Sequence, residues 1–284
     1  MSKAKITFAS LLKEVQGGNA DSQKQLDLKN KNAEEIEDLK GFKSLEKIDL
    51  SNNKLRKADF LCSNIQLRMI NFSHNNISVI PDYSKLQSLT VLNFSFNQIT
   101  NLAPLNNIKN LKALILNNNK IKTVNGLAQL TELNTLILSH NEIESLGDIV
   151  HLKGLKKLNL SHNKISDISG LKNLPIIELR LNDNNISNLP ESIKTLQSIT
   201  ILDVGNNKIA GYKNLGPIGT LPRLKNLNVK GNPIAELPDL ESKICELSAR
   251  VEILNNKKLE RTDKAFLMGK RKKERENEKK KKFD

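Results

Sequence analysis

The segment LKALILNNNKIKTVNGLAQLTE, residues 111–132, decides the fold. It opens with the pattern L-x-x-L-x-L-x-x-N-x-L, which occurs nine times along the chain. Successive units are spaced by 22 residues five times, and then by 21, 23 and 25 residues. A near-constant period indicates stacked structural units. The units begin at Leu45, Leu67, Leu89, Leu111, Leu133, Leu155, Ile176, Ile199 and Leu224.

Each unit has two halves with different apolar periods. Alternation around Leu114 and Leu116 predicts a short strand with one inward and one outward face. After the asparagine, apolar residues recur at every third position, as at Ile99, Leu102 and Leu105. This spacing favours 3₁₀ turns over a long α-helix. We therefore predict an α/β solenoid with a parallel strand ladder on one side and 3₁₀ or short helical turns on the other.

The ninth position of the pattern is asparagine in every unit. An inward amide carries both donors and an acceptor, so it can pair with turn backbone that stacking buries. We expect these side chains to be structural. They are Asn53, Asn75, Asn97, Asn119, Asn141, Asn163, Asn184, Asn207 and Asn232.

The ends of such an array need covers, because a terminal repeat has no neighbour on one side. Apolar residues at helical spacing predict a capping helix within residues 1–22. About ten repeats follow in residues 23–236, counting an incomplete first one. Pro238 opens a second helix in a C-terminal cap, residues 237–260, and a charged tail follows in residues 261–284.

The repeats resemble the 22-residue class of intracellular leucine-rich repeats, typified by the regulatory subunit family of type-1 protein phosphatase. The run SARVEILNNKKLERTD is similar to the C-terminal cap of that class, with Asn255 and Asn256 where Asp-Gly is common. The segment ISNLPESI, residues 186–193, is similar instead to the 23-residue type. The resemblance implies a leucine-rich-repeat solenoid over nearly the whole chain. Such a solenoid is a curved horseshoe, with a parallel concave strand ladder and 3₁₀ or short helical turns on its convex side, and it serves many different partners.

The third, fifth and seventh positions of each unit are expected to face outward on the concave side. In the middle units they are mildly apolar, which folding does not require, so we predict a surface that binds a protein partner. The alternative is that strand propensity alone favours these residues. The predicted partner-binding residues are Met69, Asn71, Val91, Asn93, Phe96, Ala113, Ile115, Thr135, Ile137, Lys157, Asn159, Glu178 and Arg180.

Chemistry-bearing motifs are scarce. The eighth position carries His140, His162 and Asp183 in consecutive units, which would suit a weak metal site, but filling the turn explains them better. Phosphate-binding, HExxH, GxSxG and CxxC motifs are missing, and Ser161 to Lys164 spell S-x-x-K only through the repeat pattern. We predict a non-catalytic protein without metal or cofactor.

An N-terminal motif offers a second function. Lys5, Ile6 and Phe8 match the short basic-Val/Ile-x-Phe pattern by which many proteins dock on type-1 phosphatase. The alternative is that Ile6 and Phe8 pack in the front cap. The phosphatase regulatory family presents acidic and aromatic side chains on its concave strands, and this chain presents residues such as Val91 and Ile137 instead.

The basic charge of the chain is concentrated at its end. The net charge is +14, and residues 257–284 hold 13 basic and 6 acidic side chains. Three explanations stay open: a nuclear-import signal, weak non-specific contact with RNA or DNA, and a solubilising charged helix. The import residues would be Lys270, Arg271, Lys272 and Lys273.

The location of the protein is also an expectation from the sequence. No stretch reaches the ~18 apolar residues of a membrane span, and the apolar run near the start is too short for a secretory signal. Cys62 and Cys245 cannot build a disulfide framework or a four-ligand zinc site. We expect a soluble, cytoplasmic or nuclear monomer. Its first predicted function is protein-interaction scaffold, ahead of phosphatase targeting and of an RNA- or chromatin-associated adaptor.

Overall fold

The computed structural model describes residues 4–14 and 19–259, with residues 1–3, 15–18 and 260–284 outside the description. The chain divides into two units, residues 1–163 and residues 164–284. Each unit is described by itself below. Both contain short parallel strands joined by turns, as the predicted leucine-rich-repeat solenoid requires.

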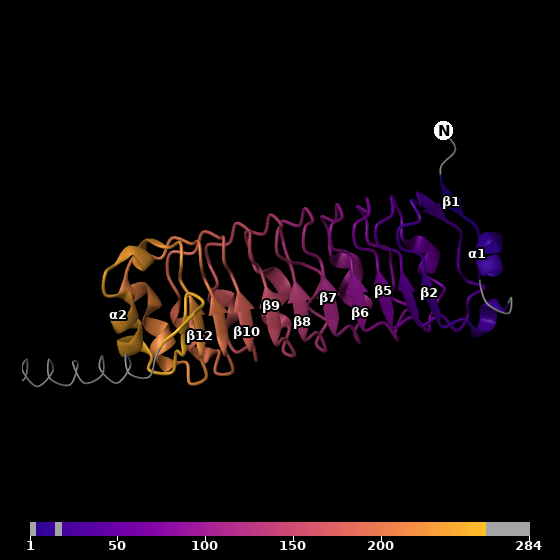
Figure 1. Ribbon diagram of the computed structural model, residues 1–284. Helices are drawn as coiled ribbons and strands as arrows, with labels where there is room; N and C mark the ends of the chain where they lie inside the picture. The colour runs from indigo at the N-terminus through magenta and orange to yellow at the C-terminus, as the bar shows by residue number, and fades with distance from the viewer. Residues whose placement is uncertain (1–3, 15–18, 260–284) are drawn as a thin grey trace, which may run out of the picture. The chain divides into compact units, whose positions relative to one another are not determined.

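The strands of the first unit form a parallel ladder with one rung per repeat (Figure 1). Each rung is three residues long, and its central residue is buried while its flanking residues face outward. The register places each residue beside its equivalent in the next repeat, as with Ile48 and Ile70. The rungs are β2 (Gln25–Asp27), β4 (Lys47–Asp49), β5 (Met69–Asn71), β6 (Val91–Asn93), β7 (Ala113–Ile115), β8 (Thr135–Ile137) and β9 (Lys157–Asn159).

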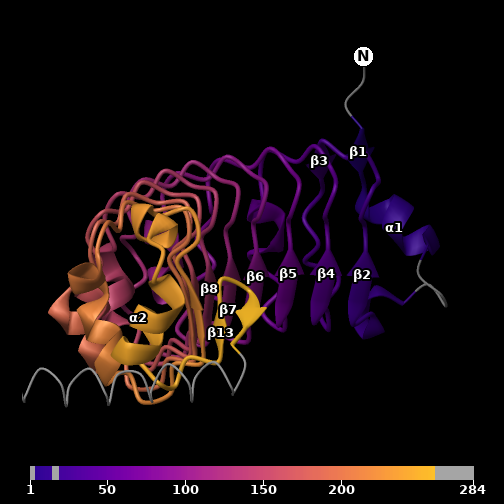
Figure 2. The same ribbon diagram turned by 60° about the vertical axis from the view of Figure 1, so that its left-hand side comes forward.

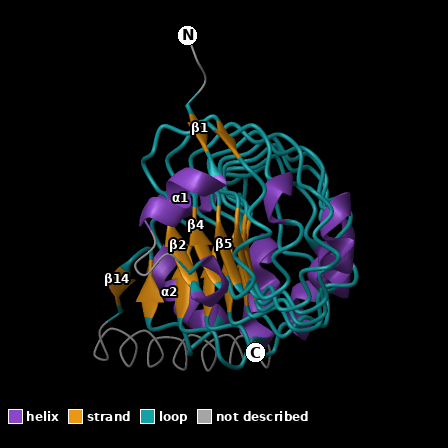
Figure 3. Ribbon diagram, turned by 90° about the vertical axis from the view of Figure 1, so that its right-hand side faces the viewer, coloured by secondary structure: helices purple, strands orange, loops and turns teal. Residues whose placement is uncertain are grey.

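The opposite side of these turns carries 3₁₀ helices, as the three-residue apolar period predicts (Figure 3). Apart from the first, which precedes the first rung, each begins near the middle of its repeat and buries apolar side chains, such as Leu105 and Ile149, against the same core that the strands cover. Thr123 and Ser145 form an isolated parallel bridge between neighbouring turns. The 3₁₀ helices of the first unit are η1 (Ala20–Ser22), η2 (Asp59–Leu61), η3 (Ala103–Asn107) and η4 (Gly147–His151).

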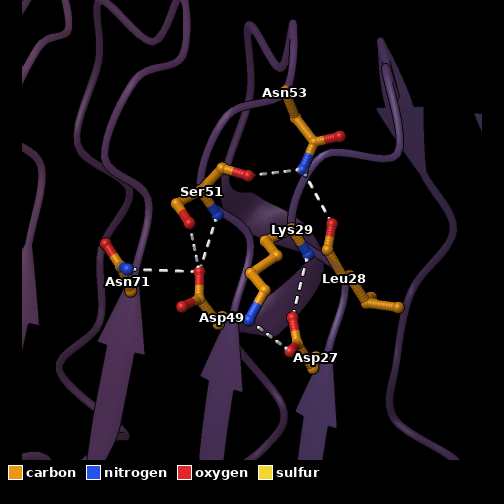
Figure 4. Close-up of polar contacts among 7 residues, drawn as sticks. All are labelled: Asp27, Leu28, Lys29, Asp49, Ser51, Asn53 and Asn71. Carbon is orange, nitrogen blue, oxygen red and sulfur yellow. Dashed lines mark hydrogen bonds and ion pairs between the residues drawn. The ribbon is translucent and has the colours of Figure 1, made fainter.

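The ladder asparagines satisfy buried backbone groups, as the sequence predicts. The Asn53 Nδ2 donates to the carbonyl of Leu28 at 2.8 Å and to that of Ser51 at 3.2 Å (Figure 4). Its Oδ1 accepts from the Ala33 N–H at 2.9 Å. The same pattern recurs at Asn75 and at the later members in both units. Each amide therefore ties its own turn to the preceding one.

The N-terminal cap combines a helix with a small separate sheet. The strand β1 (Lys5–Ile6) pairs in parallel with β3 (Glu35–Ile36), and Figure 2 shows the two side by side. The helix α1 (Phe8–Glu14) follows, with Leu11 buried. The Phe8 ring meets the Phe42 ring edge-on at a centroid distance of 5.2 Å. This packing shields the first repeat from solvent.

The second unit repeats the same plan. Its 3₁₀ helices are η5 (Ser169–Leu171), η6 (Glu191–Thr195), η7 (Tyr212–Thr220) and η8 (Pro233–Glu236). Its parallel strands are β10 (Glu178–Arg180), β11 (Ile201–Asp203) and β12 (Asn226–Asn228).

The C-terminal cap closes the second unit with a helix and a hairpin. The helix α2 (Leu240–Leu247) buries Leu240, Ile244 and Cys245. The strand β13 (Ile253–Leu254) pairs with β12 and returns through a two-residue turn into β14 (Lys257–Lys258). The turn residues Asn255 and Asn256 both have positive φ, 52° and 65°, the conformation that a tight hairpin needs and asparagine tolerates.

Candidate functional site

The outward face of the first unit gathers mostly apolar side chains from four adjacent strands, β5 to β8. We call six of them the apolar strip: Met69, Val91, Ala113, Ile115, Thr135 and Ile137. Parallel register sets Met69, Val91, Ala113 and Thr135 in one row, and Ile115 beside Ile137 in the next. Met69 is 40% exposed, and the other five are half-buried.

The third expected row reaches this face only in part, since Asn117 and Ser139 are half-buried there. We expected the seventh position of each unit to point outward, and for four serines that expectation is wrong. Their exposed fractions are 5–7% because the chain turns away from the strand there. They are Ser51, Ser73, Ser95 and Ser161.

The fifth position has a structural task that the sequence analysis missed. The Asn71 Oδ1 accepts a hydrogen bond from the Ser73 N–H at 3.1 Å, and the Asn93 Oδ1 accepts one from the Ser95 N–H at 2.9 Å. Asp49 does the same for Ser51, as Figure 4 shows. These are Asx turns that cap the end of the strand. Asn71, Asn93 and also Asn159, which caps Ser161, are therefore partly engaged in holding the fold.

Ile115 and Ile137 break this pattern side by side. The aspartate or asparagine that caps the strand at this register in β2, β4, β5, β6 and β9 is replaced by isoleucine in β7 and β8. An isoleucine side chain has no acceptor, so the local hydrogen bond is lost while apolar surface is gained. The two isoleucines therefore leave the strand ends of β7 and β8 without a side-chain cap, and they add apolar surface at the same place.

The eighth position carries aromatic side chains in a strained conformation. His74, Phe96, His140 and His162 all have φ between 53° and 56°. The His74 and Phe96 rings stack at a centroid distance of 4.0 Å, and the His140 and His162 rings stack at the same distance. Phe96 is 43% exposed. The asparagines at 52 and 118 in the same register were the signal for this left-handed turn.

Stacked imidazoles are poorly placed to share a metal ion. The His140 and His162 rings lie 12° from parallel, so their in-plane lone pairs do not converge on one point. No group of three His, Cys, Asp or Glu side chains that could hold a metal ion occurs among the described residues.

Phe96→Asn is expected to leave the stability unchanged or to raise it by up to about 1 kcal/mol. Asparagine tolerates left-handed φ better than phenylalanine, and this gain competes with the lost stacking on His74. Denaturant unfolding measures the change. Phe94→Ala, two residues earlier in the buried core, should cost about 3–5 kcal/mol in the same assay. A comparable loss in Phe96→Asn would show that the exposed ring supports folding.

Two predicted binding residues lie in the second unit. Arg180 is exposed and Glu178 is half-buried. The Arg180 Nε donates to the Glu178 Oε1 at 2.7 Å. Lys157, which belongs to the first unit, is exposed at one end of the row that continues from Thr135. These polar residues remain predictions as contact residues.

The residues of the phosphatase-docking pattern are engaged within the N-terminal cap. Lys5 and Ile6 form β1, and the Lys5 Nζ lies 3.4 Å from the Glu37 Oε1. The Phe8 N–H donates to the Glu37 Oε2 at 2.9 Å, and this bond and Lys5 lower the pKa of that carboxyl group. Packing in the cap, the alternative explanation of the motif, therefore accounts for Ile6 and Phe8.

A pocket of about 550 Å³ lies beside the small β1–β3 sheet. Its lining mixes acids with bases, and it includes Lys5, Glu35, Glu37, Arg56 and Lys57. Five acids against three bases make the lining acidic on balance, and it carries no nucleophile beside a general base.

The Cys62 thiol is also unsuited to nucleophilic chemistry. Burial, and then the nearby Asp59 and Asp82 carboxylates, raise its pKa. A raised pKa keeps the sulfur protonated and unreactive.

Two further findings concern membranes and the tail. Within residues 4–14 and 19–259, no helix has the length and apolar character to cross a bilayer. The predicted import residues Lys270, Arg271, Lys272 and Lys273 lie outside the described residues.

Comparison with known proteins identifies the repeats. The family model "Leucine Rich repeats (2 copies)" matches residues 65–107, 87–129 and 131–173. A leucine-rich-repeat protein of Leptospira interrogans superposes with a TM-score of 0.77 at 25% identity, over 94% of this chain and 68% of that one. An internalin of Listeria monocytogenes gives a TM-score of 0.75 at 23% identity, over 87% and 72%. The chain thus contains leucine-rich repeats in the corresponding solenoid fold.

Two curated relatives match shorter segments. The tubulin-specific chaperone E of Xenopus laevis is 44% identical over 66 residues, which cover 22% of this chain and 13% of the chaperone. That of Danio rerio is 42% identical over 60 residues, 21% of this chain and 11% of the chaperone. This chain therefore spans a small part of either relative. None of these matches points to the type-1 phosphatase regulatory family.

Proposed function

We propose that this leucine-rich-repeat chain is a non-catalytic interaction scaffold that holds a protein partner on the outward strand face of its first unit. One observation carries the proposal. Ile115 and Ile137 stand where the other strands of the first unit, β2, β4, β5, β6 and β9, use a capping Asp or Asn, so folding does not select them. Neighbouring apolar side chains that are half-buried before any partner arrives can bury more surface on binding.

The rigidity of the ladder supports the same role. Backbone hydrogen bonds tie the rungs of the first unit to their neighbours, and the asparagine ladder ties the turns. A preformed surface avoids the cost of ordering loops on association. The free energy gained by burying the apolar strip can therefore appear as binding affinity.

Ile115→Asp combined with Ile137→Asp is expected to weaken partner binding by roughly 30-fold or more, the effect of losing a hot spot. The charges would be buried in the interface, which costs affinity. The fold should persist, because Asp at this register caps the strand as Asp49 does. Affinity purification followed by titration of the recovered partner measures the effect.

The matched control for the Asp pair is Ile115→Val with Ile137→Val, which keeps branched apolar side chains and should keep binding. Undiminished recovery of every partner by the Asp pair would contradict the proposal. Circular dichroism and the unfolding midpoint confirm that both pairs remain folded.

Tubulin is the first partner to test. The similarity to two tubulin-specific chaperones supports this choice, although the aligned segments cover 13% and 11% of those proteins. Purified tubulin can be titrated onto the native chain and onto the Asp pair. Binding that the Asp pair loses would assign tubulin to the strand face.

Phosphatase targeting has weaker support. Lys5, Ile6 and Phe8 would have to leave the β1–β3 sheet and the Phe42 contact before they could dock elsewhere. Their replacement would disturb the cap as well as any docking. The resemblance of the repeats to the phosphatase regulatory family is the remaining support.

The tail functions stay predictions. Nuclear import through Lys270, Arg271, Lys272 and Lys273, and weak nucleic-acid contact, depend on residues outside the description. Cytoplasmic or nuclear location also stays a prediction from the sequence.

A further inference from the structure

Two backbone donors on the strand face lack a protein acceptor. The N–H groups of Asn117 and Ser139 donate to no atom of the described residues. The equivalent N–H groups of Lys29, Ser51, Ser73, Ser95 and Ser161 donate to the side chain two residues earlier, at 2.9–3.2 Å. The difference arises because residues 115 and 137 are isoleucines.

These donors open on the same face as the apolar strip. In every capped turn the accepting oxygen belongs to the outward side chain at the fifth position, as Figure 4 shows for Asp49 and Ser51. The free N–H groups therefore point to the side that Ile115 and Ile137 occupy. The rungs β7 and β8 are adjacent, so the two donors lie about 4.8 Å apart.

We propose that this site binds a carboxylate of the partner, from an Asp or Glu that follows or precedes an apolar residue. One carboxylate has two acceptor oxygens, so each can take one of the two donors. The apolar neighbour packs on Ile115 and Ile137. The partner thus supplies the acceptor that the missing Asx cap supplies in other repeats. This inference rests on the proposed function, since it names what the strip recognises.

The surrounding charge agrees with an anionic ligand. From β5 to β9 the outward third and fifth positions carry no carboxylate, and Lys157 is the cation among them. Exposed Lys112 and Lys156 lie at the start of the β7 and β9 rungs. A phosphate could also accept these hydrogen bonds, but the adjoining isoleucines favour a ligand with an apolar group beside its charge.

The test uses the full chain, labelled with ¹⁵N and with ¹³C-methyl isoleucine, and two synthetic peptides. One peptide has an Asp between two leucines, and the other has Asn at that position. We expect the Asp peptide to bind about 10-fold more tightly and to move the Asn117 and Ser139 amide proton resonances downfield. Both peptides should move the Ile115 and Ile137 methyl resonances.

A pair of variants separates the donors from the apolar surface. Ile115→Asn with Ile137→Asn supplies internal caps like those of Asn71 and Asn93, so the preference for the Asp peptide should fall to about 1. Ile115→Val with Ile137→Val supplies no acceptor and should keep the preference. The Asn pair also serves as a fold control because its residues match the repeat.

The outcomes are distinct. Equal affinity of the two peptides with shifted isoleucine methyls would overturn the carboxylate inference and leave the scaffold proposal standing. Unshifted methyls with both peptides would overturn both. A single-stranded oligonucleotide could instead shift the two amide resonances more than the Asp peptide does. That result would overturn the inference, because the ligand of the two donors would then be a phosphate and not a protein carboxylate.

Discussion

Asn141→Ala is expected to lower the free energy of unfolding by about 3–5 kcal/mol. The Asn141 Nδ2 donates to the carbonyls of Leu116 and Leu138 at 3.0 Å, and its Oδ1 accepts from the Ile121 N–H at 3.0 Å. The side chain is 9% exposed, so water cannot replace these bonds. Each buried polar group left without a partner costs about 1–3 kcal/mol.

The loss should spread beyond one turn. Asn141 links its own turn to the preceding one through Leu116 and Ile121, so both turns lose support. Stability in a repeat array depends on the interfaces between neighbours, and a broken interface weakens cooperative unfolding. Urea denaturation followed by circular dichroism should therefore show an earlier midpoint and a shallower transition.

Asn76→Ala is the matched control. Asn76 follows ladder Asn75 directly, is exposed, and its side chain makes no hydrogen bond among the described residues. A change within about 0.5 kcal/mol is expected there. Equal losses in the two variants would mean that the ladder amide has no special role.

The sequence predicted the repeat architecture because the architecture depends on periodic burial. Leu114, Leu116 and Asn119 occupy fixed places in a 22-residue period, and one core accepts all of them. The 3₁₀ side followed from the three-residue apolar spacing. Neither prediction needed a partner or a long-range contact outside the neighbouring turn.

The candidate site was predicted less completely. The strip residues were expected to face outward, but the cap at Asn71 and Asn93 depends on a backbone turn that the LxL pattern does not reveal. Asn at positions 52 and 118, beside His74 and Phe96 in the same register, was the available signal for left-handed backbone. Once the caps are known, Ile115 and Ile137 differ from the other strands of the first unit in two ways: they are apolar, and they do not cap the strand.

The small N-terminal sheet could not be predicted from the repeat pattern. The two-residue strand β1 has no alternation to detect, and its partner β3 is 30 residues away in the register of Lys5 and Glu35. From the sequence alone, the motif at Lys5 was therefore compatible with two interpretations, docking on a phosphatase and packing in the cap. Contacts of Phe8 with Phe42 and Glu37 favour packing.

Tyr83→Phe is expected to cost about 1–3 kcal/mol at neutral pH. Tyr83 is fully buried, and its Oη donates to the Ala58 carbonyl at 2.7 Å. Phenylalanine keeps the ring but leaves that carbonyl without its donor. Chemical denaturation at pH 7 measures the difference.

The same variant should change how stability depends on alkaline pH. Burial, followed by Cys62 and Asp59, raises the pKa of Tyr83 well above its ordinary value of 10.0. The folded chain therefore keeps the phenol proton at a pH where the unfolded chain releases it. The contribution of Tyr83 is complete below pH 10, and it falls by up to about 1.4 kcal/mol per pH unit above pH 10.

The difference in the free energy of unfolding between the native chain and Tyr83→Phe should therefore shrink between about pH 9.5 and about pH 11. This range brackets the ordinary phenol pKa of about 10. Comparing the two proteins at each pH cancels the shared titration of Tyr212, whose pKa burial and the Asp239 hydrogen bond raise to about 12. Tyr212→Phe should leave the shrinkage intact, because Tyr83 is still present. A constant difference across this range would mean that the folded chain releases the Tyr83 proton as easily as the unfolded chain does.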